Sequence, residues 1–268
     1  MNFNYNLFRV LASLTQEKTY SFVKNYLTKR YDSKSFIETK DYLIVTGDIP
    51  VALVAHLDTV FEVPPTNIYF DVINNVCWSP EGLGADDRAG IYAIMQIVEK
   101  GLRPSIILTT NEEIGALGAR ALGQIKCPIK DLKYVIELDR QGKDDCVFYD
   151  CGNEDFYDYI KNFGFNFNIG TYSDIKFFCS QWDVAAVNLS IGYFEEHSYV
   201  EYLNVDYLLD TIQKVINILS SENKPHFSYM KIKPLRCSKC GDVHEDVFNW
   251  TIGTYCLKCA MEEYDSTN

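Results

Sequence analysis

Short, largely apolar runs alternate along the chain with segments whose apolar residues recur every three or four positions. The runs cover residues 51–55, 105–110, 134–138 and 184–189. Runs of this length are typical of strands buried on both faces of a sheet. The helical spacing is clearest at residues 87–100 and 205–219. Because buried strands alternate with helices, the pattern predicts an α/β fold, a three-layer sandwich whose mostly parallel mixed sheet is flanked by helices.

Further elements are expected around this framework. Residues 3–31 predict two helices, the second with Thr15 as its N-cap. Residues 36–46 and 68–78 each contain two strand-like segments around a polar turn, which predicts two hairpins. Shorter elements are expected at residues 115–122 (helix), 147–149 (strand) and 155–163 (helix).

A polar stretch at residues 220–225 separates this body from a tail, so we expect two domains, residues 1–224 and 225–268. The tail holds two Cys-x-x-Cys pairs separated by fifteen residues: Cys237, Cys240, Cys256 and Cys259. This spacing predicts a small C-terminal zinc ribbon that cannot fold without its metal; redox-active pairs are the less favoured alternative. Residues 247–252 are expected to add a strand. The expected role of the ribbon is contact with a protein partner or coverage of the rim of the active site rather than catalysis, and nucleic-acid binding is the less favoured alternative.

Composition and charge narrow the class of protein. The net charge is −12 and the pI is about 4.8, which argues against nucleic acid as the main partner. No apolar run approaches the roughly 20 residues that a membrane span needs, and the N-terminus lacks the pattern of a secretory signal. The five cysteines outside the tail have no framework spacing, so a reducing, cytoplasmic setting is expected.

Acidic and imidazole side chains follow three of the predicted buried strands. His56 and Asp58 follow the first, Glu112 and Glu113 the second, and Asp139 the third. In open α/β sheets, sites lie beyond the carboxyl ends of the strands, so we expect these side chains to meet at one edge. A single Glu-Glu pair would more often belong to an ordinary helix start or loop. Three strands that deliver such groups in order favour a metal site instead.

Residues 81–90 and a late histidine extend the set. Residues 81–90 contain Asp86 and Asp87, a pair that would by itself be an ordinary acidic helix start. Of the four histidines, only His56 and His197 lie clear of the tail, and either alone would more often be structural. Two divalent cations held close together need a bridging carboxylate with imidazole and carboxylate ligands, and they would relieve the repulsion among so many acids.

Taken in order, the motifs are His-x-Asp at 56–58, Gly-x-Gly-Ala-Asp-Asp-x-x-Gly at 82–90, Glu-Glu-x-Gly at 112–115, Asp139 and His197. This ordered set resembles the co-catalytic zinc exopeptidases. That clan includes bacterial leucyl aminopeptidases, glutamate carboxypeptidases and their amidohydrolase relatives. Residues 172–178 and 187–192 are similar to the aminopeptidase branch.

The resemblance implies a role for each residue. One zinc would be held by His56, Asp86 and Asp139, and a second by Asp86, Glu113 and His197. Asp86 would bridge the two ions. Glu112 would be the general base acting on a zinc-activated water, and Asp58 would orient His56. The clan also commonly has a cis peptide bond after its bridging aspartate, which is here the Asp86–Asp87 bond.

The resemblance therefore predicts a zinc-dependent metallopeptidase or amidohydrolase with three zinc ions, two catalytic and one in the ribbon. Its expected substrate is a peptide or a small amide that contains an amino acid. Carboxypeptidase-type members of the clan insert a further domain between the Glu-Glu motif and the last histidine. Here only 83 residues, 114–196, separate Glu113 from His197, and these must also form strands and helices of the main body. The simpler aminopeptidase architecture is therefore favoured.

Two other functions stay open. An N-acyl amino acid deacylase would use the same chemistry on a different amide, and the sequence does not separate it from a peptidase. A non-catalytic adaptor would bind peptides or partners, with the zinc ribbon as its docking module. The complete set of main-domain candidates favours catalysis over the adaptor.

Overall fold

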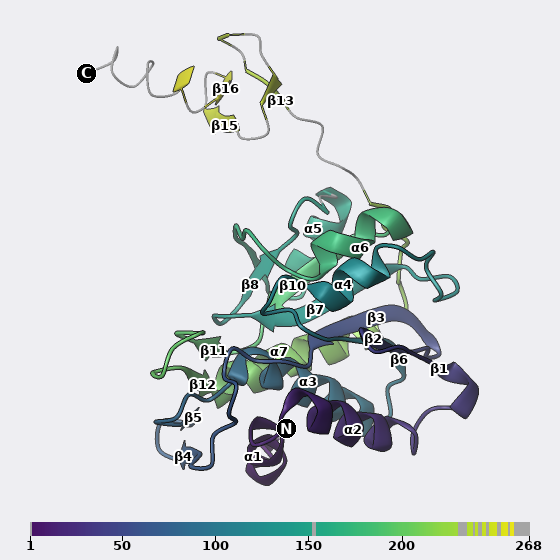
Figure 1. The fold of residues 1–268 in the computed structure, drawn as a ribbon. Helices are drawn as coiled ribbons and strands as arrows, with labels where there is room; N and C mark the ends of the chain where they lie inside the picture. The colour runs from purple at the N-terminus through teal and green to yellow at the C-terminus, as the bar shows by residue number, and fades with distance from the viewer. Residues whose placement is uncertain are drawn as a thin grey trace. The chain divides into compact units, whose positions relative to one another are not determined.

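An eight-stranded mixed sheet runs through the larger part of the chain in this computed structural model (Figure 1). Its strands, in spatial order, are β1 (Phe36–Glu38), β2 (Tyr42–Val45), β6 (Pro104–Thr109), β3 (Ile49–His56), β7 (Tyr134–Arg140), β10 (Ala186–Ser190), β8 (Asp145–Val147) and β9 (Asn166–Phe167). β3 pairs in parallel with β6 and β7, β7 with β10, and β8 with β9; the remaining pairs are antiparallel. The predicted mostly parallel mixed sheet is confirmed.

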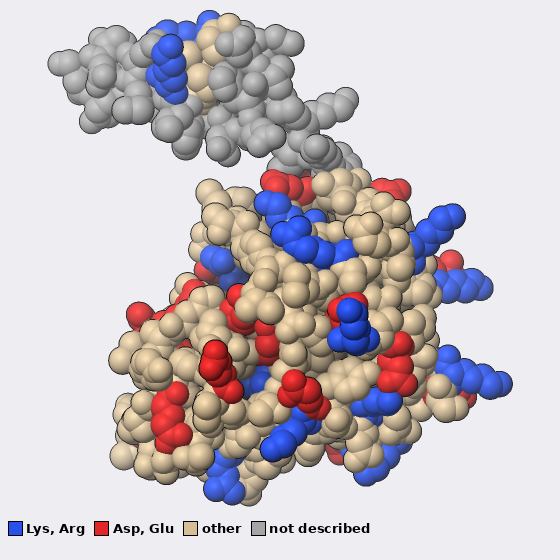
Figure 2. Space-filling view, viewed as in Figure 1, with Lys and Arg blue, Asp and Glu red and all other residues tan. Residues whose placement is uncertain are grey.

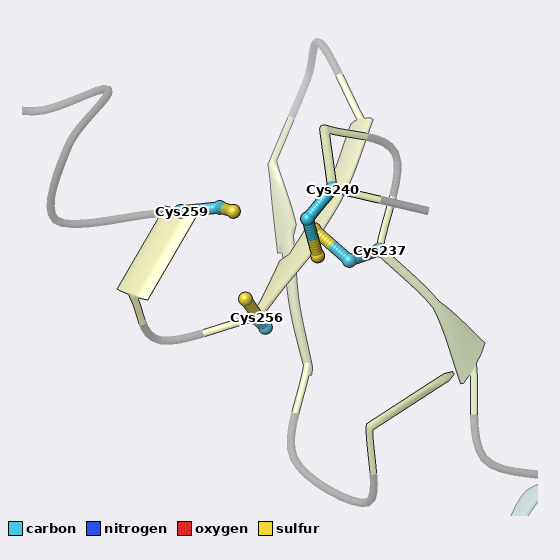
Figure 3. A group of neighbouring side chains, drawn as sticks. All are labelled: Cys237, Cys240, Cys256 and Cys259. Atoms are coloured by element: carbon cyan, nitrogen blue, oxygen red, sulfur yellow. The ribbon is translucent and has the colours of Figure 1, made fainter. Parts of the chain in front are cut away.

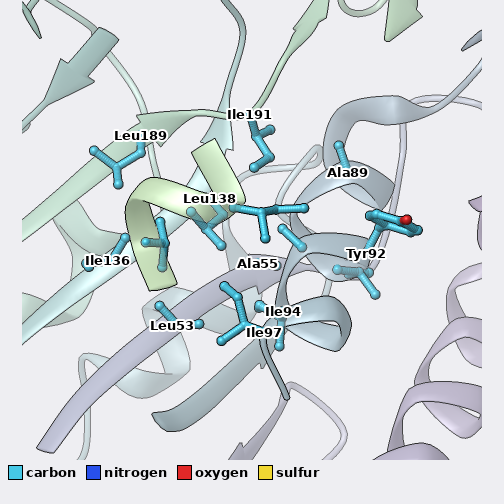
Figure 4. Close-up of a cluster of buried hydrophobic side chains, with 14 of the residues drawn as sticks. Leu53, Ala55, Ala89, Tyr92, Ile94, Ile97, Ile136, Leu138, Leu189 and Ile191 are labelled. Atoms are coloured by element: carbon cyan, nitrogen blue, oxygen red, sulfur yellow. The ribbon is translucent and has the colours of Figure 1, made fainter. Parts of the chain in front are cut away.

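Helices cover both faces of this sheet. One face carries α1 (Tyr5–Ala12), α2 (Gln16–Leu27), α3 (Ala85–Glu99), α5 (Glu154–Lys161) and α7 (Val205–Ser220), and the other carries α4 (Leu117–Leu122) and α6 (Ile175–Trp182). Successive side chains of a strand point to opposite faces. Leu53 and Ala55 of β3 therefore belong to the cluster that contains Ile94 and Ile97 of α3, as Figure 4 shows, whereas Ala52 and Val54 belong to the core on the α4 and α6 side. The result is the expected three-layer sandwich.

The structure describes residues 2–151, 154–229, 235–237, 239–240, 243–244, 247–250, 253–256 and 258–259. The chain divides into two compact units, Met1–Met230 and Lys231–Asn268. Residues 225–229 pack on the first unit, because Phe227 donates its N–H to the Lys133 carbonyl (3.0 Å) and accepts from the Ala185 N–H (2.8 Å). Within the described residues, every helix is too short or too polar to span a bilayer.

The predicted N-terminal helices and hairpins are present. Asn4 caps α1 through a hydrogen bond from the Leu7 N–H (3.1 Å), whereas Thr15 takes the N-cap position of α2 without a side-chain capping bond. A 3-10 helix at Ser33–Ser35 leads into the β1–β2 hairpin. The second hairpin consists of β4 (Tyr69–Asp71) and β5 (Val76–Trp78).

A second sheet brings a late segment of the chain back to this hairpin. It has the order β11 (Tyr193–Phe194), β12 (Tyr202–Asn204), β5 and β4. Cys77 of β5 pairs with Leu203 of β12. The loop at residues 195–201, which contains His197, is held by this pairing. The sequence pattern missed β9, β11 and β12 because strands of two or three residues are too short to show alternation.

The second unit contains two short hairpins. They are formed by β13 (Leu235–Arg236) with β14 (Val243–His244), and by β15 (Val247–Trp250) with β16 (Gly253–Cys256). Residues 251–252 of the strand expected at 247–252 lie outside the described residues.

On the face of the protein drawn in Figure 2, acidic and basic side chains are interspersed, so neither sign dominates that face.

Candidate metal centre

The carboxyl ends of β3, β6 and β7 bring the predicted residues together. These strands are parallel neighbours, so their ends lie at one edge of the sheet. A pocket of about 700 Å³ opens at this edge, and its lining includes Asp86, Glu112, Glu113, Asp139 and His197. His56, at the end of β3, is buried beside them with an exposed fraction of 1%. The main-domain candidates from five separate stretches of sequence thus share one site.

His56 contacts two of the acids through one ring nitrogen. Its Nε2 atom lies 2.8 Å from Asp86 Oδ1 and 3.5 Å from Asp139 Oδ1. Its other nitrogen, Nδ1, lies 3.4 Å from Asp58 Oδ1 and has no hydrogen-bond partner among the described residues. Burial alone would lower the pKa of His56, but the carboxylates of Asp139, Asp58 and Asp86 raise it well above its usual value.

His197 contacts the opposite side of the same aspartate. Its Nε2 atom lies 3.2 Å from Asp86 Oδ2 and 3.1 Å from Glu113 Oε2. Hydrogen bonding to Asp86 and Glu113 raises the pKa of His197 to about 11. The two carboxylate oxygens of Asp86 therefore face two different imidazoles, which are delivered by β3 and by the loop after β11.

These donors suit divalent metal ions in both chemistry and spacing. Nitrogen and oxygen ligands that share a tetrahedral zinc at 2.0–2.2 Å lie about 3.4 Å from one another. The contacts around Asp86, between 2.8 and 3.5 Å, are close to that spacing. One buried oxygen of Glu113, Oε1, has no hydrogen-bond partner among the described residues. Burial and the neighbouring Asp86 raise the pKa of Asp139 well above its usual value, a penalty that a cation at this position would offset.

Glu112 and Asp58 hold distinct positions beside this cluster. Glu112 lines the pocket with an exposed fraction of 8%, and burial raises its pKa to about 7. Asp58 accepts hydrogen bonds from the backbone N–H groups of Glu112 and Glu113, both at 3.0 Å. Although burial opposes ionisation, His56 and these two donors lower the pKa of Asp58. Asp58 therefore fixes the Glu-Glu segment as well as facing His56.

The start of α3 has the backbone that the resemblance implied. The Asp86–Asp87 peptide bond is cis. Asp87 is fully buried and accepts hydrogen bonds from the N–H groups of His56 (3.1 Å) and Gly90 (2.8 Å). A side chain at position 90 would place its Cβ 2.2 Å from the carbonyl oxygen of Leu138, so only glycine permits this approach of α3 to β7.

Three residues that the sequence reasoning did not single out support the site. Glu201 is fully buried and accepts from the N–H groups of Gly84 (2.6 Å) and Asp86 (3.0 Å). Tyr193 donates its hydroxyl to Asp139 Oδ1 (3.1 Å). Asn188 bonds both backbone groups of Asp139, at 3.0 and 2.7 Å. A polar residue inside the apolar run 184–189 was the available signal for Asn188, whereas Glu201 and Tyr193 had none.

Two more acids, Glu137 and Asp174, are buried close enough to Glu112 to raise its pKa or have their own raised by it. Glu137 of β7 accepts from the Ser173 hydroxyl, and Asp174 accepts from the Thr109 hydroxyl. Burial raises the pKa of Glu137 well above its usual value and raises the pKa of Asp174 to about 6. The other oxygen of Asp174, Oδ1, has no hydrogen-bond partner among the described residues.

The four cysteines of the second unit converge. The Sγ atoms of Cys237, Cys240, Cys256 and Cys259 all lie within 4.8 Å of one another, and Figure 3 shows them directed at a common point. Thiolates around one tetrahedral zinc at 2.3 Å lie about 3.8 Å apart, so the group fits that metal. The cluster is compatible with the expected ribbon.

Comparison with known proteins agrees with this fold. The profile of Peptidase family M28 matches residues 37–177, which is more than half of the chain. No curated protein matches the sequence. The fold and the carboxylate–imidazole centre are those of a metal-dependent hydrolase. The chain belongs to peptidase family M28, and it is a metallopeptidase.

Solved structures support the same fold at low sequence identity. Aminopeptidase PepT from Bacillus cereus ATCC 10987 is 15% identical with a TM-score of 0.63, and the match covers 80% of this chain and 96% of that one. A tripeptidase from Staphylococcus aureus subsp. aureus Mu50 is 14% identical with a TM-score of 0.61, covering 80% and 96%. A TET aminopeptidase from a marine sediment thaumarchaeote is 12% identical with a TM-score of 0.63, covering 81% and 96%.

Proposed function

We propose that this M28 peptidase is a two-zinc, aminopeptidase-like enzyme that cleaves an amide bond of a peptide or of a small substrate containing an amino acid. The observation that carries the proposal is the position of Asp86. Its Oδ1 atom lies 2.8 Å from one imidazole and its Oδ2 atom 3.2 Å from the other. This is the arrangement that a carboxylate needs to bridge two cations.

The proposed ligand sets follow from these contacts. His56, Asp86 and Asp139 hold one zinc, and Asp86, Glu113 and His197 hold the other. A third zinc in the second unit is structural and is held by Cys237, Cys240, Cys256 and Cys259. The catalytic unit then corresponds to the first part of the chain and the ribbon to the second.

Glu112 is the proposed general base. When bound, the zinc ions supply Lewis-acid activation of water and of the amide carbonyl. Glu112 lines the pocket, and burial raises the pKa of its carboxyl group, which favours acceptance of a proton from the attacking water and its return to the leaving amine. Asp58 is a positioning residue, because it holds the backbone of Glu112 and faces His56 Nδ1.

The preference for a free amine is supported by structural likeness and by the short chain between Glu113 and His197. Solved structures with this fold include an aminopeptidase and a tripeptidase. The test is to count zinc per chain and to compare hydrolysis of free and N-acetylated forms of one peptide. We expect three zinc ions and cleavage of the free form. Cleavage of only the acetylated form would identify a deacylase, and one zinc without turnover would leave the adaptor function.

Glu112→Gln separates catalysis from metal binding in the same assay. Because glutamine cannot accept the proton, we expect kcat to fall by about 10²- to 10⁴-fold while the zinc content stays at three per chain. Glu62→Gln, at an exposed position, is the matched control and should retain full activity. A fully active Glu112→Gln variant would show that another group is the base.

A further inference from the structure

Arg140 lies in the wall of the pocket, next to the metal centre. It is the last residue of β7 and directly follows Asp139. Of the described residues that line the pocket, Arg140 is the only arginine or lysine. Its side chain is largely buried, with 16% of it exposed. A guanidinium in this position needs partners, since it carries five N–H donors and stays ionised.

Arg140 has few partners within the described residues, namely the Tyr149 hydroxyl, the Ile169 carbonyl oxygen and the Asp145 carboxylate. Its Nε atom is buried and has no hydrogen-bond partner among the described residues. One Nη atom lies 3.4 Å from the Ile169 carbonyl oxygen and 3.7 Å from Asp145 Oδ2. Hydrogen bonds between arginine and a carboxylate are normally 2.7–2.9 Å long. The guanidinium is therefore only loosely held by its own chain.

Asp145 does not act as a dedicated counter-ion. Its Oδ2 atom, the one that faces Arg140, also accepts a shorter hydrogen bond from Asn168 Nδ2 at 2.8 Å. The Asp145 side chain is 30% exposed, so water screens much of its attraction for Arg140. An anion that enters the pocket could therefore accept hydrogen bonds from Arg140, including one from its buried Nε–H group.

The charge of Arg140 also remains when the other charges of the metal centre are balanced against one another. Two divalent cations, as proposed above, would balance the four carboxylates at the metal centre: Asp86, Glu112, Glu113 and Asp139. The remaining charged lining residues, apart from His197, are Arg140 and Glu196. Glu196 accepts a hydrogen bond from Gln141 (2.6 Å) at an exposed position. With the metals in place, Arg140 is thus the buried basic side chain among the described residues that line the pocket.

The neighbouring wall of the pocket is largely aromatic and apolar. Tyr149, Ile169, Gly170 and Tyr172 line the pocket together with Arg140. A Cβ at position 170 would lie 2.7 Å from the Tyr149 ring, so glycine lets this loop pass close to the tyrosine. The wall therefore combines apolar and aromatic surface with one cation, a combination that orients a ligand through a single charged contact.

We propose that Arg140 binds a carboxylate of the substrate, so that the enzyme selects short peptides carrying a carboxylate close to the scissile amide. The inference rests on the proposed peptidase function and names the substrate class of the same site. A planar guanidinium pairs with a carboxylate through two parallel hydrogen bonds. The carboxylate can be the C-terminus of a dipeptide or the acidic side chain of the N-terminal residue.

Two substrate pairs distinguish these sources. The first is Ala-Ala against Ala-Ala-amide, and the second is Glu-Ala-amide against Gln-Ala-amide. We expect the zinc-loaded enzyme to prefer the carboxylate-bearing member of at least one pair by roughly tenfold or more in kcat/KM, since hydrogen bonds between charged groups are about twice as strong as neutral ones. The pair that shows the preference identifies the source. Equal kcat/KM within both pairs would overturn the inference.

The Arg140→Gln variant assigns the preference to this residue. We expect it to reduce the ratio within the preferred pair to about one, and Arg140→Lys, which keeps the charge without the planar fork, to give an intermediate ratio. Arg9→Gln, at an exposed position on α1, is the matched control and should leave the ratio unchanged. A ratio that persists in Arg140→Gln would mean that the metal centre itself selects the carboxylate, which also overturns the inference.

Binding measured without turnover separates this inference from the proposed function. Calorimetry on zinc-loaded Glu112→Gln should show tighter binding of the carboxylate-bearing peptide than of its amide, again by roughly tenfold or more. Adding Arg140→Gln should remove that difference. If the peptides bind equally, the carboxylate site is wrong even when the wild-type enzyme hydrolyses both. If selective binding occurs without any wild-type hydrolysis, the peptidase function fails while Arg140 keeps its role.

Discussion

At the scale of single residues, Asp86 combines burial with contacts to two imidazoles. It is 8% exposed, each carboxylate oxygen faces a different imidazole, and its backbone N–H is held by Glu201. Its hydrogen bonds to His197 and His56 lower its pKa, although burial opposes ionisation. Asp86 is thus kept charged between two sets of proposed zinc ligands. We expect both sets to lose their metal when this charge is removed.

Asp86→Asn tests this shared role. Asparagine keeps the shape but offers one neutral oxygen, so we expect zinc per chain to fall from three to one, with only the ribbon metal retained. Metal analysis of the purified variant measures this directly, and Asp48→Asn at an exposed position serves as the control. A loss of one zinc only would show that Asp86 is a terminal ligand of a single site and not a bridge.

The same scale shows what the sequence can and cannot predict. His56, Glu113 and Asp139 could be placed in one site because each follows an apolar run that is recognisable by itself. Glu201 could not, since it lies in a polar segment between strands of two and three residues, and its burial depends on contacts with Gly84 and Asp86, more than a hundred positions earlier. For Arg140 the residue type was visible, but the small number of its partners within the described residues is a property of the folded pocket.

At the scale of elements, the start of α3 is positioned by the second sheet. β12 pairs with β5, and Glu201, directly before β12, accepts the N–H groups of Gly84 and Asp86. The start of α3, with Asp86, is therefore fixed by the second sheet, whose β11–β12 loop also carries His197, whereas His56, Glu113 and Asp139 come from the eight-stranded sheet. Sequence patterns predicted the central strands and α3 but missed this connection, because short strands gain their stability from tertiary pairing rather than from their own alternation.

Glu201→Gln tests the connection between these elements. The amide would place an N–H donor against a backbone N–H donor, so we expect the free energy of unfolding of the metal-free protein to fall by about 1–3 kcal/mol. Zinc affinity of the main unit should fall as well, since the Asp86 backbone loses its support. Chemical denaturation with chelator and zinc titration measure the two effects, with Glu62→Gln as the exposed control. Unchanged stability in the metal-free protein would contradict the assigned role.

At the scale of the whole molecule, the two units are stabilised in different ways. The first unit has two extensive apolar clusters, one on each face of its sheet. In the second unit, the described buried cluster consists of Cys237, Tyr255, Cys256 and Cys259. Three of these four residues are proposed zinc ligands, so we expect metal binding to supply much of the folding free energy there. The first unit does not depend on that metal for its core.

Cys256→Ser should therefore separate the two units. We expect zinc per chain to fall from three to two, and limited proteolysis to remove the chain beyond residue 230, because a structural zinc site that loses a thiolate no longer folds its module. Hydrolysis of free peptides should stay within about twofold of wild type, since the proposed catalytic ligands all lie in the first unit. Cys127→Ser, a half-buried cysteine of the first unit, is the control and should keep three zinc ions. Loss of turnover in Cys256→Ser with both main-unit zinc ions retained would show that the ribbon takes part in substrate binding. The proposal that the first unit alone carries out catalysis would then be wrong.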